Sequence, residues 1–191
     1  MRAPRQVISN EVQRVGMPAA GSDGTGIGIA LLDSGRDFNH PDLKPAPNTP
    51  ATAFNAVSPG ASCQDDGGHG THIAGLIAAQ NNTIGIVGVA PAARLYCVKI
   101  LGADLTGTDS DVIAGLDWVF QHGNSVNPPI RVVNMSLGRP LGAGETMANS
   151  VIRPLIQALY NAGVVVVVSA GNNPSLEVSQ VVPPDFRRRS L

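Results

Sequence analysis

Four short apolar runs, separated by segments of helical periodicity, constrain the fold of this chain more than any other feature. The runs cover residues 26–32, 94–101, 131–137 and 163–169. Residues 70–79 and 110–121 show helical spacing, and a third helix is expected to begin near Arg153, because Pro154 is tolerated only in a first turn. Strands that alternate with helices indicate parallel pairing with right-handed crossovers. We therefore predict an α/β fold, a three-layer parallel β-sheet flanked by helices.

The last apolar run contains five consecutive valines, from Val164 to Val168. An uninterrupted β-branched run is typical of a strand that is covered on both sides. We therefore predict that this strand is buried on both faces of the sheet. Residues 41–68 are rich in Pro, Gly, Asn and Asp, and we expect them to form loops.

Composition narrows the class of protein. A chain of 191 residues is expected to form one domain with a sizeable core. Its formal net charge of −1 argues against a general nucleic-acid binder, because phosphate neutralisation requires an excess of basic residues. No apolar stretch reaches the roughly 18 residues of a membrane span. The amino-terminal residues also lack the apolar segment of a signal peptide, so neither a membrane partner nor a signal is expected.

The two cysteines, Cys63 and Cys97, are too few for a disulfide framework or a zinc site. Cys97 lies within an apolar run, so we expect it to be a small buried hydrophobic residue. Cys63 lies in a turn-rich stretch, and its state is left open.

Polar residues that carry chemistry follow the ends of the predicted strands. Asp33 follows the first strand, Ser136 ends the third, and Asn172 follows the valine strand. His69 begins a helix directly after a Gly-rich loop. Ligands of parallel sheets bind beyond the carboxyl ends of the strands, so we expect an acid, an imidazole and an amide to share one edge.

Four segments carry a family resemblance. They are Ala-Leu-Leu-Asp-Ser-Gly at 30–35, His-Gly-Thr-His-Ile-Ala-Gly at 69–75, Asn-Met-Ser-Leu-Gly at 134–138 and Ser-Ala-Gly-Asn at 169–172. In order, spacing and flanking residues the chain resembles the subtilisin-like serine proteases, or subtilases. The resemblance implies a subtilisin-like fold, incomplete at the carboxyl end, and a serine-type endopeptidase that acts on polypeptides. It also implies an extracellular location, although no signal peptide is recognisable in the sequence.

The resemblance assigns roles to three residues. Peptide hydrolysis needs a nucleophile, a base, a group that orients the base, and donors to the oxyanion. By resemblance His69 is the general base, Asp33 orients it, and the side-chain amide of Asn172 donates to the oxyanion. His72 lies on the same helix face as His69, but a metal pair is disfavoured because no third ligand is apparent. The alternatives are a strand-end turn residue for Asp33, a helix cap for His69 and a turn residue for Asn172.

Substrate contacts are also carried over from the family. Ser136, Leu137 and Gly138 resemble the edge that pairs with an extended peptide substrate, and a plain strand end is the alternative. Residues 101–107, which end at Gly107, resemble the opposite edge. The family usually has a small residue where Leu105 stands, so pocket specificity on this side does not carry over.

A calcium site is implied by the same resemblance. Asp42 and the segment 80–86 resemble the calcium loop of many subtilases. The expected ligands are side-chain oxygens or main-chain carbonyls of Asp42, Gln80, Asn82, Ile84 and Ile86, because Ca²⁺ prefers six to eight oxygens. Gln6 is a weaker match for one more. The alternative is a loop that only connects a helix to a strand.

The nucleophile of the family is not found. The family places it in a Gly-Thr-Ser-Met-Ala segment well after the oxyanion Asn, and no serine after Asn172 has those neighbours. Thr146 lies in a similar Gly-Glu-Thr-Met-Ala segment, but it precedes Asn172. We therefore expect this chain alone to be proteolytically inert, and to be unstable or molten without the helix that carries the serine. A pseudoprotease that binds peptides without cleaving them is the alternative function.

The ends of the chain define three expected regions. Residues 1–11 form an amino-terminal extension, 12–182 a partial peptidase domain, and 183–191 an aberrant basic tail with three adjacent arginines. A frameshift or early stop near Phe186 would explain that tail, and a genuine short tail is the alternative. A nucleotide-binding reading of Gly24–Gly28 fails, because these glycines precede the strand instead of following it.

Overall fold

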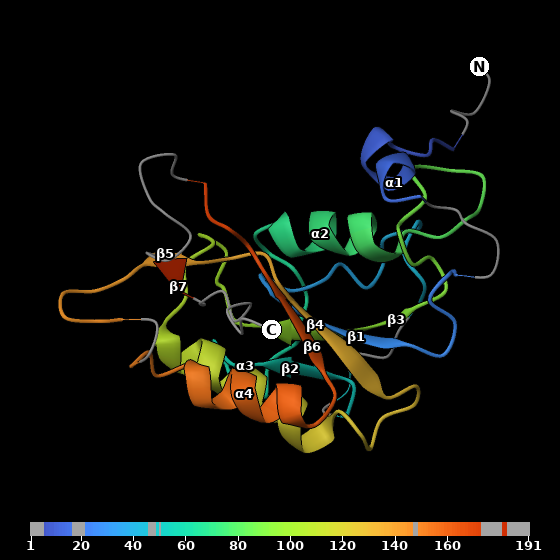
Figure 1. Ribbon diagram of the computed structural model, residues 1–191. Coiled ribbons are helices and arrows are strands. Elements are labelled where there is room, and N and C mark those ends of the chain that lie inside the picture. The colour runs from blue at the N-terminus through green and yellow to red at the C-terminus, as the bar shows by residue number, and fades with distance from the viewer. Residues whose placement is uncertain are drawn as a thin grey trace, which may run out of the picture.

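A five-stranded parallel sheet forms the centre of the molecule (Figure 1). The structure is a computed structural model that describes residues 6–16, 22–45, 49, 51–146, 149–172 and 181–182. The sheet has the order β2-β3-β1-β4-β6, and each adjacent pair is parallel. Its strands are β1 (Gly28–Asp33), β2 (Ala53–Asn55), β3 (Arg94–Lys99), β4 (Ile130–Met135) and β6 (Val165–Val168). The expected parallel α/β fold is therefore confirmed.

Helices cover the sheet, and two short strands pair apart from it. The helices are α1 (Asn10–Arg14), α2 (His69–Ala78), α3 (Asp109–His122) and α4 (Arg153–Asn161). In Figure 1, α2 lies on one side of the sheet and α3 and α4 lie on the other. β5 (Arg139–Pro140) and β7 (Val181–Val182) form a separate antiparallel pair. No helix among the described residues combines the length and apolar character needed to cross a bilayer.

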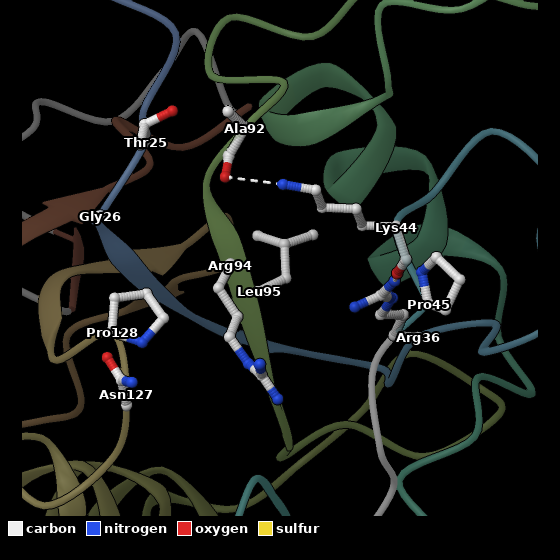
Figure 2. A pocket seen from close by; sticks show the side chains of 10 residues that line it. All are labelled: Thr25, Gly26, Arg36, Lys44, Pro45, Ala92, Arg94, Leu95, Asn127 and Pro128. Atoms are coloured by element: carbon white, nitrogen blue, oxygen red, sulfur yellow. Dashed lines mark hydrogen bonds between the residues drawn. The ribbon is translucent and has the colours of Figure 1, made fainter.

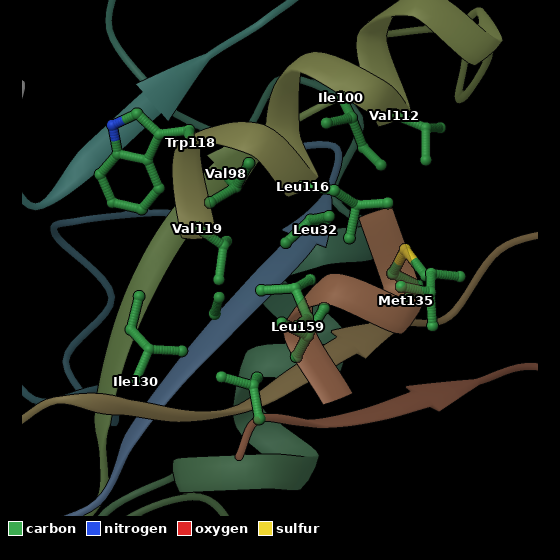
Figure 3. Packing of buried hydrophobic residues seen from close by; sticks show 14 of the residues in the cluster. Leu32, Val98, Ile100, Val112, Leu116, Trp118, Val119, Ile130, Met135 and Leu159 are labelled. Carbon is green, nitrogen blue, oxygen red and sulfur yellow. The ribbon is translucent and has the colours of Figure 1, made fainter. Parts of the chain in front are cut away.

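Alternation along β1 divides the core between the two faces. Ala30 and Leu32 pack with α3 and α4 in the larger cluster, which Figure 3 shows. Ile29 and Leu31 pack with α2 in the second cluster. Successive side chains of a strand point to opposite faces, so a fully buried β1 requires helices on both sides. This strand therefore lies at the centre of three layers.

The helix ends follow local chemistry. α4 begins at Arg153 with Pro154 in its first turn, as predicted. α3 begins one residue earlier than the predicted range, and its cap is Thr108. The Thr108 side chain accepts from the Asp111 backbone N–H, and the Asp111 side chain accepts from the Thr108 backbone in return. This capping box satisfies two amide groups that a helix start leaves unpaired.

The prediction that the valine strand is buried on both faces is wrong. Val165 and Val167 are 58% and 48% exposed, whereas Val166 and Val168 pack against the larger core. The physical reason is position: β6 is the last strand in the sheet order, and the described helix on the face opposite α3 and α4 lies over the middle of the sheet. A run of valines therefore indicates a strand but not how many of its faces are covered.

The expectations for residues 41–68 and for the cysteines need correction. Ala53–Asn55 is a strand, paired in parallel with β3, although the stretch was expected to form loops. Cys97 is buried, as expected, but it is not a free hydrophobic residue, because it forms a disulfide with Cys63. The parallel pairing of β2 and β3 draws the chain around Cys63 against β3, which a count of cysteines cannot reveal.

Candidate active site

Asp33 and His69 meet at the carboxyl edge of the sheet. Asp33 is the last residue of β1 and is fully buried, and His69 is the first residue of α2. The His69 Nδ1 atom lies 2.7 Å from Asp33 Oδ1, and 35% of the His69 side chain is exposed. A buried carboxylate that contacts one ring nitrogen leaves the other nitrogen free to exchange a proton at the surface.

The approach of α2 to the end of β1 depends on Gly70. A Cβ atom on Gly70 would lie 2.1 Å from the backbone oxygen of Gly35, so this position has no room for a side chain. The Gly70 N–H donates to Ser34 Oγ at 2.9 Å. The Ser34 backbone N–H donates to Asp33 Oδ1 at 2.7 Å. The two chain segments that carry the pair are thus joined directly beside it.

Asp65 holds the start of α2 together with the turn that follows β1. Its Oδ1 accepts from Ser34 Oγ at 2.8 Å and from the Gly68 N–H at 2.9 Å. Its Oδ2 accepts from the Thr71 hydroxyl at 2.5 Å and from the Thr71 N–H at 2.8 Å. Burial raises the pKa of Asp65, but the hydrogen bonds from Thr71, Ser34 and Gly68 outweigh it and lower the pKa to about 2. The Asp65 carboxylate therefore stays charged at the amino end of α2.

Lys99 is a second organising residue that sequence reasoning missed. It ends β3 and is 4% exposed. Its ammonium group donates to the carbonyl oxygens of Ser34 at 2.5 Å and Leu101 at 2.9 Å, and to Asp66 Oδ1 at 2.6 Å. Asp65 lies in a loop-like stretch and Lys99 in an apolar one. They are 31 and 65 residues from Ser34 in the chain, so no local sequence pattern indicates their contacts with it.

The segments predicted to bind substrate lie near the same edge. Ser136, Leu137 and Gly138 follow β4, and Gly138 is exposed. Gly107 lies in the exposed segment after β3. Leu105 in that segment has a left-handed backbone with φ of 62°, and its side chain lies against Gly67. A leucine rarely adopts this conformation, which marks the segment as locally strained.

Asn172 lies in the exposed segment after β6. The pairing of Met135 with Val168, followed by a 3.2 Å hydrogen bond from Ser169 N–H to Met135 O, brings this segment beside the end of β4. Within the described residues, no hydrogen bond joins Asn172 to Asp33 or His69. The structure thus places Asn172 on the expected edge without a direct contact to the Asp33–His69 pair.

The residues predicted to bind calcium gather around the side chain of Gln6. Its Nε2 atom lies 2.6 Å from Gln80 O, 3.2 Å from Asn82 Oδ1, and 3.1 Å from both Ile84 O and Ile86 O. An amide nitrogen carries two hydrogens, so it cannot donate well to four oxygens at once. Hard cations bind where oxygens converge, and these four would be part of the six to eight that Ca²⁺ takes.

Asp42 lies beside these oxygens and is 5% exposed. Its Oδ1 accepts from Asn82 Nδ2 and its Oδ2 accepts from the Ile86 N–H, both at 3.0 Å. Among the described residues, no group of three or more His, Cys, Asp or Glu side chains could hold a metal ion. A cation here would therefore depend mainly on carbonyl and amide oxygens.

Comparison with known proteins identifies the family. The sequence profile of the Subtilase family matches residues 24–184. Subtilisin BL of Lederbergia lenta is 40% identical over 171 residues, which cover 88% of this chain and 57% of the relative. The alkaline protease of Shouchella clausii is 40% identical over 88% of this chain and 40% of its own length. Subtilisin E of Bacillus subtilis is 36% identical over 87% of this chain and 39% of its own length.

This chain therefore spans from about two fifths to somewhat over half of the length of these relatives. The family match covers the Asp33–His69 contact, the edge after β4 and the segment that reaches Asn172. The structure agrees with the sequence profile, because an acid and an imidazole are in contact at the carboxyl edge of a parallel sheet. The chain belongs to the subtilase family of serine proteases.

Proposed function

We propose that this chain carries the acid–base half of a subtilisin-type serine endopeptidase site and that its substrates are polypeptides. The supporting observation is the 2.7 Å contact between buried Asp33 and partly exposed His69. Asp33 fixes the tautomer of the ring and stabilises the imidazolium, while the outer ring nitrogen takes the proton of an attacking hydroxyl. Asn172 donates its side-chain amide to the oxyanion, and residues 136–138 align the peptide.

The attacking hydroxyl is not assigned to any residue of this sequence. Ser175, Ser179 and Ser190 follow Asn172, and none has the flanking Gly, Met and Ala of the family nucleophile. Without a nucleophile, His69 has no proton to remove and no acyl-enzyme forms. We therefore propose that the 191-residue chain alone does not cleave peptides, whereas the same residues act in a polypeptide that supplies the missing serine.

The experiment compares the chain with a fusion in which the matching carboxyl-terminal part of Subtilisin BL follows Asn172. We expect casein cleavage by the fusion and none by the chain alone. His69→Ala in the fusion removes cleavage, whereas His72→Ala, three residues further along α2 and exposed, retains it. Cleavage by the unfused chain that is lost in His69→Ala would disprove the missing nucleophile. A folded fusion without activity would disprove the assignment of the Asp33–His69 pair.

We also propose that Gln80, Asn82, Ile84, Ile86 and Asp42 bind Ca²⁺ as a structural ion. The four oxygens around Gln6 Nε2 support this, and the side-chain oxygen of Gln6 could add another ligand, since amide nitrogen and oxygen exchange places by rotation. Asp42 supplies a negative charge beside them. Such an ion would link residues near the amino terminus to the loop after α2.

The calcium proposal predicts a stability that depends on Ca²⁺. Binding to the folded state alone raises the melting temperature with ion concentration. We expect this rise in scanning calorimetry, with a smaller response to Mg²⁺, which demands a tighter octahedral shell. Asn82→Ala should remove the response, and Asn81→Ala, on the exposed neighbour, should retain it. A melting temperature that ignores Ca²⁺ and chelator, or that responds equally in both variants, would contradict the site.

We also propose an extracellular location, as the resemblance to the subtilases implies. The disulfide between Cys63 and Cys97 supports it, because disulfides persist in oxidising compartments and are rare in the cytosol. Fractionation of the native source, with blocking of free thiols before lysis, would test it. A reduced Cys63–Cys97 pair in a cytosolic fraction would contradict the proposal.

A further inference from the structure

A cationic hollow lies at the end of the sheet opposite the Asp33–His69 pair. It has a volume of about 510 Å³, and its lining includes the side chains of Arg36, Lys44 and Arg94 (Figure 2). Arg94 begins β3, whereas Asp33 ends the adjacent strand β1 in register with Lys99, the last residue of β3. Five residue steps along a strand span roughly 16 Å. The hollow is thus separate from the candidate active site.

Two guanidinium groups in this hollow each carry a buried Nε–H without a hydrogen-bond partner among the described residues. Arg36 is 2% exposed, and its Nε–H has no hydrogen-bond partner within the described part of the chain. The same holds for the buried Nε–H of Arg94. Figure 2 shows Arg94 extending from β3 and Arg36 entering from the opposite wall beside Lys44. A buried polar donor without a partner is costly, and a buried charge more so.

The existing contacts of these cations are with neutral groups. One Arg36 Nη atom donates to the Lys44 carbonyl, and Lys44 Nζ donates to the Ala92 carbonyl at 3.1 Å. The guanidinium carbons of Arg36 and Arg94 lie 5.6 Å from the ring centres of Phe38 and Tyr96 respectively. None of these contacts supplies a negative charge, so none of these hydrogen bonds or ring contacts neutralises the three cations.

The nearby carboxylates are engaged elsewhere. Asp37 acts electrostatically on Arg36, but its Oδ1 accepts from the Asn39 N–H and from Gln64 Nε2. Asp23 acts weakly on Lys44, and its Oδ1 accepts from the Thr25 N–H. No ion pair among the described residues involves the three cations, and the adjoining sequence segments 17–21 and 46–48 contain no acidic residue. Burial, together with the charge of Arg94, lowers the pKa of Arg36 to about 10.

From this arrangement we propose that the hollow binds a phosphate-type oxyanion. Guanidinium groups present flat pairs of N–H donors that match phosphate oxygens, and a lysine adds a point charge. A dianion balances this concentration of positive charge better than a single carboxylate does. Pro45, Leu95 and Pro128 form apolar parts of the lining, so the volume accommodates a phosphate monoester with a small organic group as well as free phosphate.

Isothermal titration of the 191-residue chain with inorganic phosphate, in a low-salt buffer without phosphate, tests this proposal. We expect saturable binding that Lys44→Gln and Arg94→Gln each weaken by about tenfold or more, as for a lost charged hydrogen bond. Arg14→Gln, which removes an equal charge at the exposed end of α1, should leave the affinity unchanged. Absence of binding, or equal weakening by Arg14→Gln, would overturn the proposal.

A second measurement, of melting temperatures, tests the same proposal with a variant that is expected to stay folded. Arg36→Met removes the buried charge, so without phosphate it should melt at the same or a higher temperature than the unmodified chain. We expect phosphate to raise the melting temperature of the unmodified chain but not that of Arg36→Met; an equal rise in both would contradict the site. Titration with phenyl phosphate then separates the two sources of the anion: tighter binding than inorganic phosphate identifies a monoester, and weaker binding identifies the free ion.

Discussion

Asp65 shows how a single side chain can set the position of the Asp33–His69 pair without touching it. It accepts hydrogen bonds from Ser34, which follows Asp33, and from Thr71, which lies in the first turn of α2 with His69. The two residues of the pair therefore share one anchor. An uncharged Asp65 would lose acceptor capacity for these donors at the place where the two segments meet.

The pKa of Asp65 predicts a pH dependence of stability. Its folded-state pKa is about 2, against 3.8 for a free Asp, so its contribution is complete above pH 4 and is lost as the pH falls toward 2. Asp65→Asn should lower the urea midpoint at neutral pH and flatten its dependence on pH between 4 and 2. Asp117→Asn, which removes a carboxylate that accepts from Gln121 on α3, is the control and should keep the original slope. An unchanged slope in Asp65→Asn would contradict the role of this carboxylate.

Residues could be predicted from the sequence where a motif fixes them. Asp33 and His69 lie in dense, specific motifs, and the structure brings their side chains to 2.7 Å. Asp65 and Lys99 escaped prediction because their contacts with Ser34 join positions 31 and 65 residues apart, which only folding brings together. The orienting network of the site is therefore a tertiary property, whereas the pair it orients has a local sequence signature.

At the scale of elements, the disulfide joins the loop before α2 to the strand β3. It closes a separation of 34 residues, and both sulfurs lie in a small buried cluster with Ala53 of β2. Because β2 has only three residues, its place beside β3 gains support from this covalent link. The link also restrains the segment that leads to His69.

The double variant Cys63→Ala/Cys97→Ala should lower the free energy of unfolding by about 3–4 kcal/mol, from the chain entropy of a loop of this length. The measurement is urea unfolding of the oxidised chain and of the variant. Treatment of the original chain with a reductant should produce a similar loss, which separates the bond from the effect of the alanines. Equal midpoints for the oxidised chain and the variant would show that the bond does not contribute to stability.

Helices and strands could be predicted where the apolar pattern is strong. They could not be predicted where tertiary packing decides whether a segment pairs or is covered. Short apolar runs located β1, β3 and β4, and helical spacing together with Pro154 located α2, α3 and α4. β2 is too short to show a period, and it is a strand because β3 offers an edge for pairing. The exposure of β6 depends on what lies over it, which no pattern within the valine run encodes.

At the scale of the whole molecule, β6 is an edge strand with one exposed face within the part of the chain that the structure describes. Among the described residues it pairs only with β4, and Val165 and Val167 are largely exposed. The chain covers only 39–57% of the length of its relatives, so an intact protein of that length would have further chain available to pack here. The expectation that the chain alone is unstable or molten stays a prediction. The exposed Val165 and Val167 mark a place where its apolar surface is uncovered.

An unpaired apolar strand edge is a template for association with another chain. We therefore expect the 191-residue chain to self-associate with rising concentration in analytical ultracentrifugation and to bind the dye ANS. Val165→Thr/Val167→Thr keeps β-branched side chains but adds hydroxyl groups, so it should shift the distribution toward monomer and reduce dye binding. Val57→Thr, at a valine that is 41% exposed outside the sheet, provides the matched control and should change neither. A monomeric chain without dye binding would instead show that this edge is protected, because a bare apolar edge and a stable monomer are not compatible at high concentration.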